Sequence, residues 1–268
     1  MDPPKPFPIL RLPFLAIEEV FKAMHPFEII NFSLISNWTK QITKSMNFYP
    51  EYSVALDINK ILKIAIRGTD HIVSCIYEMT SKKNLDGVIG KHVLDIFNKQ
   101  TIDTLTVDMV EFVNYNVSMI DFLKTNEISV NKCSLFHWDC NINVDEHAAY
   151  LLENIKINNE FNFYLHIKNV NLDLKIPKGL TKLKMINTNW IGYKQLLEID
   201  SVTVNVHKNR TSYNDWNLFF KKWISMETNL NLELLDFVFE SMKEFKDGVL
   251  FDIPYEVVDK RVKRAIKT

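Results

Sequence analysis

The stretch LTKLKMINTNWIGYKQLLEIDSVTVNV, from Leu180 to Val206, contains the pattern of one strand, one short helix and a second strand. Its first part, LTKLKMI, and its last part, SVTVNV, have the length and the apolar or β-branched residues of strands. Between them, Gly192 to Ile199 has the pattern of a short helix. This unit predicts that strands and helices alternate in the surrounding chain.

The same alternation continues on both sides of this unit. Strands are expected at SLFHW (134–138), FYLHI (163–167) and LELLDFVF (232–239), and helices at Val144 to Ile155 and Tyr213 to Ser225. The strands begin about 20 to 30 residues apart, which is the spacing of leucine-rich-repeat-like β/α units. The L-x-x-L-x-L signature is only partly present, with Leu180-x-x-Leu183 as its best match. We expect 130–240 to form β/α repeats, with the strands on a concave sheet and the helices outside.

A different pattern precedes the repeats. The runs YSVALDI, ILKIAIR and HIVSCIYEM are rich in β-branched residues and partly alternate between apolar and polar positions. They predict a three-stranded antiparallel β-meander within 51–80. A polar loop, a short helix over 91–98 and a longer helix over 108–124 are expected to follow.

The N-terminal segment FPILRLPFLAIEEVFKAMHPFEIINFSLIS, from Phe7 to Ser36, is apolar but interrupted by prolines. Pro13 suits the first turn of a helix, and the residue before Pro26 is disfavoured in the α region, so a first helix is expected between the two prolines. The apolar side of this helix, at helical spacing, consists of Ile17, Val20, Phe21 and Met24. A second helix is expected to carry Phe27, Ile30 and Leu34, and a third, from Asn37 to Met46, to turn inward Trp38, Ile42 and Met46.

Three short helices in about 40 residues cannot bury this much apolar surface among themselves. The segment therefore needs a partner, which is either the rest of the chain or another protein.

The composition limits the classes of function. The chain has 268 residues, of which 47% are hydrophobic, and its formal net charge is −1. Neither nucleic acid nor an anionic membrane is therefore an expected partner. Three cysteines without disulfide spacing favour a reducing compartment, and no run approaches the roughly 18–20 apolar residues of a membrane span. We expect a cytoplasmic or nuclear protein.

Catalytic and metal-binding patterns are weak. The best candidate for a zinc site is the series Cys133, His137, Cys140 and His147, but its spacing fits no standard ligand pattern, and ordinary buried thiols and histidines are the favoured interpretation. The nucleophile-elbow, zincin and P-loop motifs are all missing from the sequence. We expect no catalytic residues, no metal and no cofactor.

Two further patterns have a structural and a functional interpretation. Helical spacing of Trp216, Phe219, Phe220 and Trp223 indicates the inward face of a helix rather than an interface. The basic C-terminal residues, with Lys260-Arg261 and Lys263-Arg264 at their centre, could contact phosphate or act as an import signal, but a solvated tail is favoured.

The N-terminal segment resembles an F-box. The resemblance lies in Leu12-Pro13, in the apolar pair Val20-Phe21, in Met24 before the Pro26 turn, and in Ile30, Leu34 and Ile35-Ser36. The sequence of this segment is most similar to the large group of nematode F-box proteins. Asn37 and Trp38 differ from the usual pattern, in which a basic residue follows the serine and the tryptophan comes one position later.

This resemblance implies that the three helices bind a Skp-type adaptor and, through it, a cullin–RING ubiquitin ligase. The implied adaptor-binding residues are Leu12, Pro13, Ile17, Val20, Phe21, Met24, Pro26, Ile30 and Leu34. The remainder resembles an F-box-associated domain, through DWNLFFKKWISMETNLNLELLDF (215–237) and the ending FDIPYEVVDKRVKRAIKT.

Together these features predict an α+β protein with an F-box over 1–50 and an F-box-associated, substrate-binding domain over 51–268. The implied function is substrate recognition for an SCF-type ubiquitin ligase, with a protein as the substrate. The alternative is a protein-binding scaffold that carries an F-box but does not direct degradation.

Overall fold

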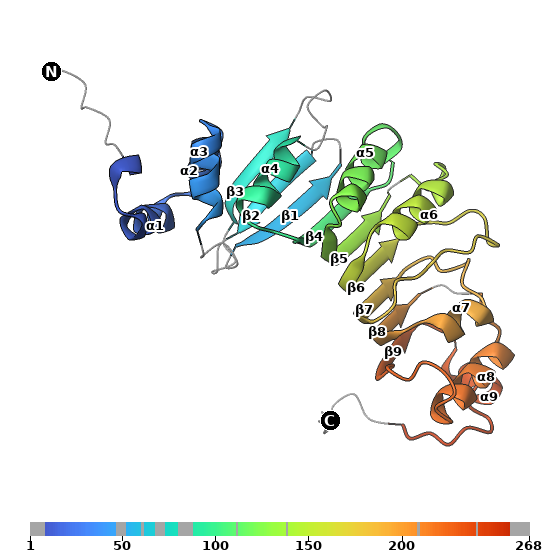
Figure 1. The fold of residues 1–268 in the computed structure, drawn as a ribbon. Helices are drawn as coiled ribbons and strands as arrows, with labels where there is room; N and C mark the ends of the chain where they lie inside the picture. Colours follow the sequence, from blue (N-terminus) through green and yellow to red (C-terminus); the bar gives the residue numbers. More distant parts are fainter. Residues whose placement is uncertain are drawn as a thin grey trace.

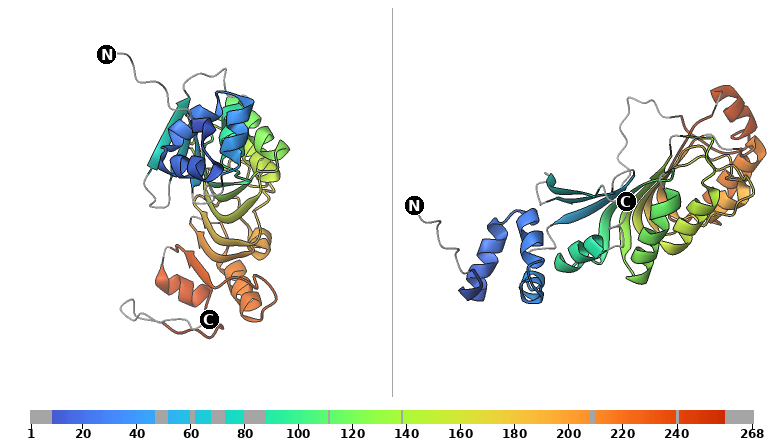
Figure 2. Two further views of the ribbon diagram at one scale, coloured as in Figure 1. Left: turned by 60° about the vertical axis from the view of Figure 1, so that its left-hand side comes forward. Right: turned by 90° about the horizontal axis from the view of Figure 1, so that it is seen from above.

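The computed structural model of the chain describes residues 9–46, 52–59, 62–67, 73–79, 88–110, 112–137, 139–207, 210–239 and 241–257. Three N-terminal helices precede one long sheet, and the sheet bends into an arc with helices along its outer side (Figure 1). Seen from above, the helices and the strands form two layers (Figure 2).

The N-terminal helices begin and end at recognisable signals. They are α1 (Phe14–Ala23), α2 (Pro26–Ser33) and α3 (Asn37–Lys44), after a 3-10 turn at Ile9–Arg11. At the start of α2, the His25 backbone N–H donates to Glu28 and its ring accepts from the Phe27 N–H. At the start of α3, Ser36 and Thr39 exchange equivalent bonds at 3.1 and 2.9 Å. These caps satisfy amide groups that have no partner inside the helices.

One nine-stranded sheet, in the order β3-β2-β1-β4-β5-β6-β7-β8-β9, runs through the rest of the described chain. Strands β1, β2 and β3 pair in antiparallel fashion, whereas β1 is parallel to β4 and every later neighbour is also parallel. The strands are β1 (Ser53–Ile58), β2 (Leu62–Arg67), β3 (Val73–Met79), β4 (Thr101–Asp108), β5 (Ser129–Phe136), β6 (Ile157–Tyr164), β7 (Leu180–Met185), β8 (Ser201–Val206) and β9 (Leu234–Phe237).

Helices connect most of the parallel strands, as parallel pairing requires. They cover the outer face of the sheet and are α4 (Val88–Ile96), α5 (Phe112–Thr125), α6 (Asp145–Asn154), α7 (Tyr193–Glu198) and α8 (Tyr213–Ile224), followed by α9 (Met242–Gly248) after the last strand (Figure 1).

The core lies between the sheet and these helices. Strand register aligns buried side chains in rows across the sheet, since paired residues share a face. One row contains Leu56, Leu105, Cys133, Phe161, Leu183 and Val204. The next contains Ile58, Val107, Leu135, Phe163, Met185 and Val206. The two rows make the meander and the β/α units parts of one core.

The meander and the strand–helix alternation are confirmed, and β8 coincides with the predicted strand over 201–206. The α+β class needs correction, because the meander is hydrogen-bonded into the same sheet as the β/α units and the chain is therefore mixed α/β. Strand β4 and helix α9 were not expected, and the helix predicted over 108–124 begins at Phe112 because β4 occupies residues up to Asp108.

Candidate protein-interaction surfaces

Phe21 connects α1 to α2. Its ring is fully buried and meets the Phe32 ring edge to face, with the centroids 5.2 Å apart. Ile17, Ile29 and Ile30 belong to the same hydrophobic core, which continues into the sheet. The other buried residues of the three helices are Pro26, Ser33, Thr39 and Thr43. The N-terminal segment thus buries part of its apolar surface within the folded chain.

Helix α3 faces its neighbours with threonines rather than with Trp38. The Thr43 hydroxyl donates to the Thr39 carbonyl at 2.8 Å, and the Thr39 hydroxyl donates to the Ser36 carbonyl at the same distance. Because these hydroxyls bond to the helix backbone, they can be buried at little cost. The expected inward position of Trp38 is wrong, since 56% of this residue is exposed, whereas Met46 is buried as expected.

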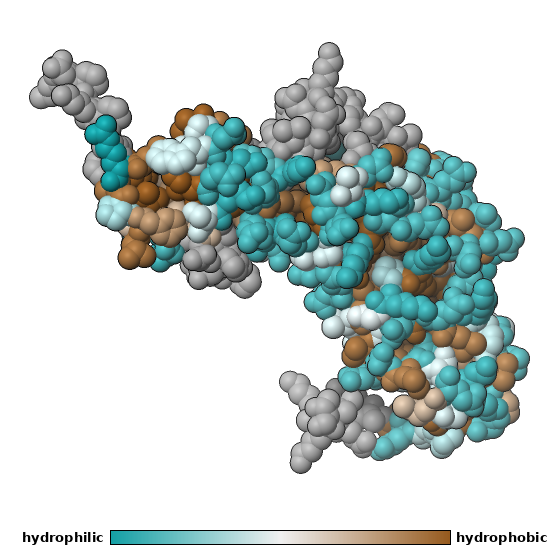
Figure 3. All heavy atoms as spheres, in the orientation of Figure 1, coloured by the Kyte–Doolittle hydropathy of each residue, from teal (hydrophilic) through white to brown (hydrophobic). Residues whose placement is uncertain are grey.

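Six apolar residues on the same helices stay exposed to solvent. Their exposed fractions range from 47% for Phe14 to 74% for Leu15, and the set is Phe14, Leu15, Phe27, Leu34, Ile35 and Trp38. Hydrophobic residues gather visibly over this part of the molecule (Figure 3). Contiguous exposed apolar surface commonly marks a site of protein contact. We call these six residues the apolar set.

The residues expected to bind an adaptor divide into three groups. Ile17, Phe21, Pro26 and Ile30 are buried. Leu12, Val20 and Met24 are partly buried, and Pro13 and Leu34 are exposed. That all nine residues bind an adaptor remains a prediction. The sequence did not identify Phe14 and Leu15 as exposed, because the sequence around a helix start does not show whether an apolar residue there faces the core or the solvent.

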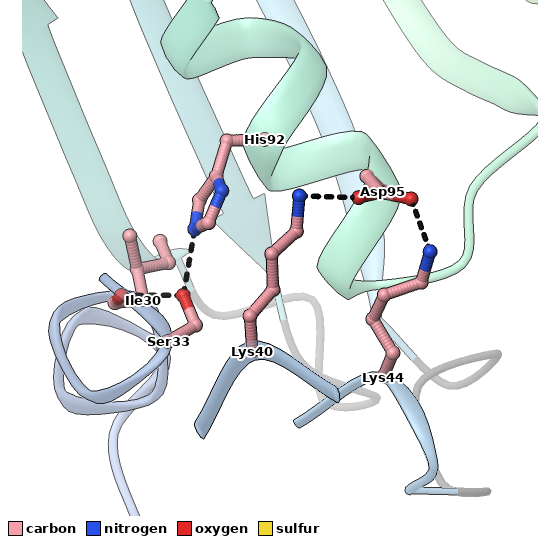
Figure 4. A network of polar contacts seen from close by, with 6 residues as sticks. All are labelled: Ile30, Ser33, Lys40, Lys44, His92 and Asp95. Carbon is pink, nitrogen blue, oxygen red and sulfur yellow. Dashed lines mark hydrogen bonds and ion pairs between the residues drawn. The ribbon is translucent and has the colours of Figure 1, made fainter. Parts of the chain in front are cut away.

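A polar junction joins the N-terminal helices to α4 of the sheet domain (Figure 4). The Asp95 carboxylate accepts from Lys40 at 2.8 Å and from Lys44 at 2.6 Å. Beside it, the Ser33 hydroxyl lies 2.7 Å from the His92 ring and donates to the Ile30 carbonyl at 2.6 Å. These contacts hold α2 and α3 against α4 at two points.

The junction shifts the titration of its ionisable groups. Partial burial disfavours the charged form of Asp95, but the bonds and charges of Lys40 and Lys44 outweigh it and hold the pKa of this carboxyl below its usual value. Burial lowers the pKa of His92, and repulsion from Lys40 adds to this shift. At neutral pH the junction is thus one carboxylate between two cations, beside a neutral imidazole.

We expect Asp95→Asn to loosen this junction, because both lysines lose their anionic partner. The loss should be about 1–2 kcal/mol of unfolding free energy, as for a partly exposed pair of charge-assisted hydrogen bonds. Urea unfolding measures it. The matched control is Glu78→Gln, which removes the exposed Lys63–Glu78 ion pair of 2.9 Å and should cost clearly less than Asp95→Asn, because solvent screens this pair. Equal effects of the two substitutions would contradict a clamping function of Asp95.

The inner face of the sheet is polar. The side chains that alternate with the buried ones along each strand point to this face. Several of them bond to one another across neighbouring strands. Asn162 donates to Ser134 at 3.1 Å, and Lys132 pairs with Glu160 at 3.1 Å. Such a face is suited to a polar partner rather than to an apolar one.

The four candidate zinc ligands do not converge. Cys133 lies in the sheet core, where burial raises the pKa of its thiol strongly, and Cys140 is exposed on the following turn. In the described part of the chain, no three His, Cys, Asp or Glu side chains are grouped so that they could hold a metal ion. His137 is buried, and among the residues that the structure describes neither ring nitrogen has a hydrogen-bond partner.

The histidines predict a pH dependence of stability. Burial lowers the pKa of His137, with repulsion from His166 as the next cause, and the pKa of His92 is lowered as well. In the unfolded chain a histidine takes up its proton near pH 6.5, so between pH 7.5 and 5.5 the unfolded state binds more protons. Stability should therefore fall as the pH falls, by at most about 1.4 kcal/mol per pH unit for each histidine.

Urea midpoints at pH 7.5, 6.5 and 5.5 measure this slope. His137→Leu should flatten it, because the substitution removes a titrating ring without removing a hydrogen bond. A midpoint that is equal at pH 7.5 and 5.5 in the unsubstituted chain would contradict the prediction.

The aromatic stripe of α8 lies against the last strand, as expected. Trp216 stacks on Phe237 with a centroid distance of 4.7 Å, and Trp223 donates to the Leu232 carbonyl at 3.1 Å. The basic residues 260–267 lie outside the described residues. None of the helices in the described part combines the length and hydropathy that a membrane crossing requires.

Comparison with known proteins gives one family match. Residues 152–237, which include β6 to β9, match the family model described as F-box associated. The segment 215–237 lies inside this range, whereas the ending from Phe251 onward lies beyond it. No F-box family model matches the N-terminal helices. No curated protein and no solved structure matches the chain. Over residues 152–237 the chain is therefore similar to F-box-associated domains.

Proposed function

We propose that this chain is the substrate-recognition subunit of an SCF-type ubiquitin ligase. Helices α1 to α3 would bind a Skp-type adaptor, which links them to the cullin, and the F-box-associated domain would hold the protein to be ubiquitinated. The observation that carries this proposal is the presence in one chain of an F-box-associated domain at 152–237 and an N-terminal three-helix unit with six exposed apolar residues.

The apolar set supports the adaptor contact on energetic grounds. Phe27 lies in the first turn of α2 and Leu34 caps its C-terminal end two turns later, so both lie on one side of the helix. Ile35 follows Leu34, and Trp38 lies in the first turn of α3. Each large apolar side chain that becomes fully buried contributes about 1.5–3 kcal/mol before the costs of association. A few such residues are sufficient for a stable complex with a groove on another protein.

The junction at Asp95 supports the proposal because it would fix the adaptor-binding helices relative to the substrate-binding domain. A receptor of this kind does no chemistry itself and acts by raising the effective concentration of its substrate near the ubiquitin carrier. A fixed contact between α3 and α4 limits the range of positions that a bound substrate can occupy. The apolar set and the last strands lie toward opposite ends of the arc (Figure 1), which leaves room for two partners.

Co-purification of the full-length chain with a Skp-type adaptor and a cullin tests the proposal. We expect all three proteins in one complex, and ubiquitination of proteins bound to the chain. A complex with the adaptor that lacks cullin would favour the protein-binding scaffold. A chain that never retains the adaptor would contradict both functions.

A further inference from the structure

Within the described residues, the last strand of the sheet has an open edge, since β9 pairs only with β8. The Glu233 N–H donates to the Val202 carbonyl at 2.9 Å. The even-numbered residues of β8 face β9, since Val202 accepts this bond, and the register Thr203↔Leu234 and Asn205↔Asp236 then directs the backbone groups of Leu234 and Asp236 toward β8. Because backbone groups alternate in direction along a strand, Leu235 and Phe237 direct their N–H and C=O groups outward. Among the described residues, nothing bonds to these outward groups.

The side chains along this edge form an alternating pattern. Leu234 and Val238 are each 57% exposed, and Asp236 is exposed between them. The Asn205 amide donates to the Asp236 carboxylate at 2.6 Å, which fixes the position of the charge. Within the described residues, Asp236 has no cationic partner. The edge therefore offers apolar, acidic and apolar side chains at every second residue.

The opposite edge of the sheet is protected in ways that β9 is not. Strand β3 is contacted by α2, its pairing with β2 shifts register at Ile66 and Arg67, and the charged pair Lys63–Glu78 crosses it. Covering elements, irregular pairing and lysines are the usual means of preventing unwanted strand addition. Strand β9 has the sequence LLDF, without lysine or proline, and its pairing with β8 is regular.

We propose that the β9 edge binds an extended segment of the partner protein, which joins the sheet as an additional strand. The backbone of this segment would bond to the outward groups of Leu235 and Phe237. A lysine or arginine would lie opposite Asp236, with apolar side chains two residues before and after it, packed on Leu234 and Val238. This assignment rests on the proposed function, because the segment belongs to the protein that the domain recognises. Backbone pairing provides affinity in such complexes and the alternate side chains provide specificity.

A pair of synthetic decapeptides tests the charge preference. Both carry valine two residues before and after the central residue, which is lysine in one peptide and glutamate in the other. Fluorescence anisotropy with the full-length chain should show at least about tenfold tighter binding of the lysine peptide, because the glutamate would face Asp236. Asp236→Lys should reverse the order. Equal binding of both peptides, or no binding up to about 1 mM, would overturn the assignment.

A second variant tests the backbone contact. Leu235→Pro removes an outward N–H but none of the groups that pair with β8, and proline is tolerated at such edge positions. The Leu235 side chain is partly buried, so Leu235→Ala, which keeps the N–H, is the matched control. The two variants should unfold at similar urea midpoints, and only Leu235→Pro should lose the lysine peptide. Full retention of the peptide by Leu235→Pro would overturn the assignment, and so would dimerisation of the free chain through this edge, which would identify a second copy as the occupant. Adaptor co-purification, measured on the same variants, reports separately on the proposed function.

Discussion

The double substitution Leu34→Asp with Ile35→Asp is expected to abolish co-purification of the chain with a Skp-type adaptor. Leu34 is 61% exposed and Ile35 is 71% exposed, so neither contributes much to the folded chain alone. Burying both in an adaptor groove would contribute about 3–6 kcal/mol, and aspartates there would add the cost of burying unpaired charges. The affinity should fall at least about 100-fold, since each 1.4 kcal/mol is a factor of ten.

The control replaces two exposed apolar residues by aspartate at a different place in the molecule. Leu218 and Met226 are exposed apolar residues at the other end of the chain, 40% and 64% exposed. Leu218→Asp with Met226→Asp should therefore leave adaptor binding unchanged. Both double variants should unfold near the urea midpoint of the unsubstituted chain. An unchanged affinity of the Leu34 and Ile35 variant would show that the adaptor, if bound, contacts a different surface.

The strand–helix alternation could be predicted because each element has its own local pattern. Strand β8 is bounded by Asp200 and a polar turn, and its β-branched residues identify it directly. Strand β4 could not be recognised in this way. Its buried residues Ile102, Leu105 and Val107 are spaced by three and then by two positions, so the period of two is broken. The extra residue, Asp103, accepts a hydrogen bond from the Val54 N–H at 2.7 Å, a contact that only the assembled sheet creates.

The candidate surfaces were harder to predict than the fold. Five of the eight residues of α2 are apolar and lie on more than one side of the helix, so hydropathy does not distinguish the exposed Phe27 from the buried Ile30. The inward side of α3 is formed by two buried threonines whose hydroxyls bond to backbone carbonyls at the start of and within the helix. Sequence patterns treat threonine as polar, so they assign this side to solvent. The open edge of β9 is a property of the sheet order, because a strand is an edge only when nothing follows it in space.

Truncation of Phe21 is the second change with a large expected effect. This side chain is completely buried and packs on Phe32, and replacing a buried phenylalanine by alanine costs about 3–5 kcal/mol. A unit of three short helices has little stability to lose, so Phe21→Ala should unfold it locally while the sheet remains folded. Hydrogen exchange should show loss of protection in 14–44 and retained protection in β4 to β6. Phe21→Leu, which keeps most of the volume, should cost roughly 1.5 kcal/mol or less.

Comparison with Phe27 distinguishes a loss of adaptor binding caused by unfolding from one caused by the loss of a direct contact. Phe27 is 48% exposed on the neighbouring helix, so Phe27→Ala should change stability by about 0.5 kcal/mol or less and still weaken adaptor binding. Phe21→Ala should weaken adaptor binding only through unfolding, and its loss of affinity should follow its loss of protection from hydrogen exchange. If Phe21→Ala instead kept full protection and lost the adaptor, Phe21 would be a direct contact, as the F-box resemblance implies. The helices would then have to open when the adaptor binds, because in the free chain no part of this ring reaches the surface.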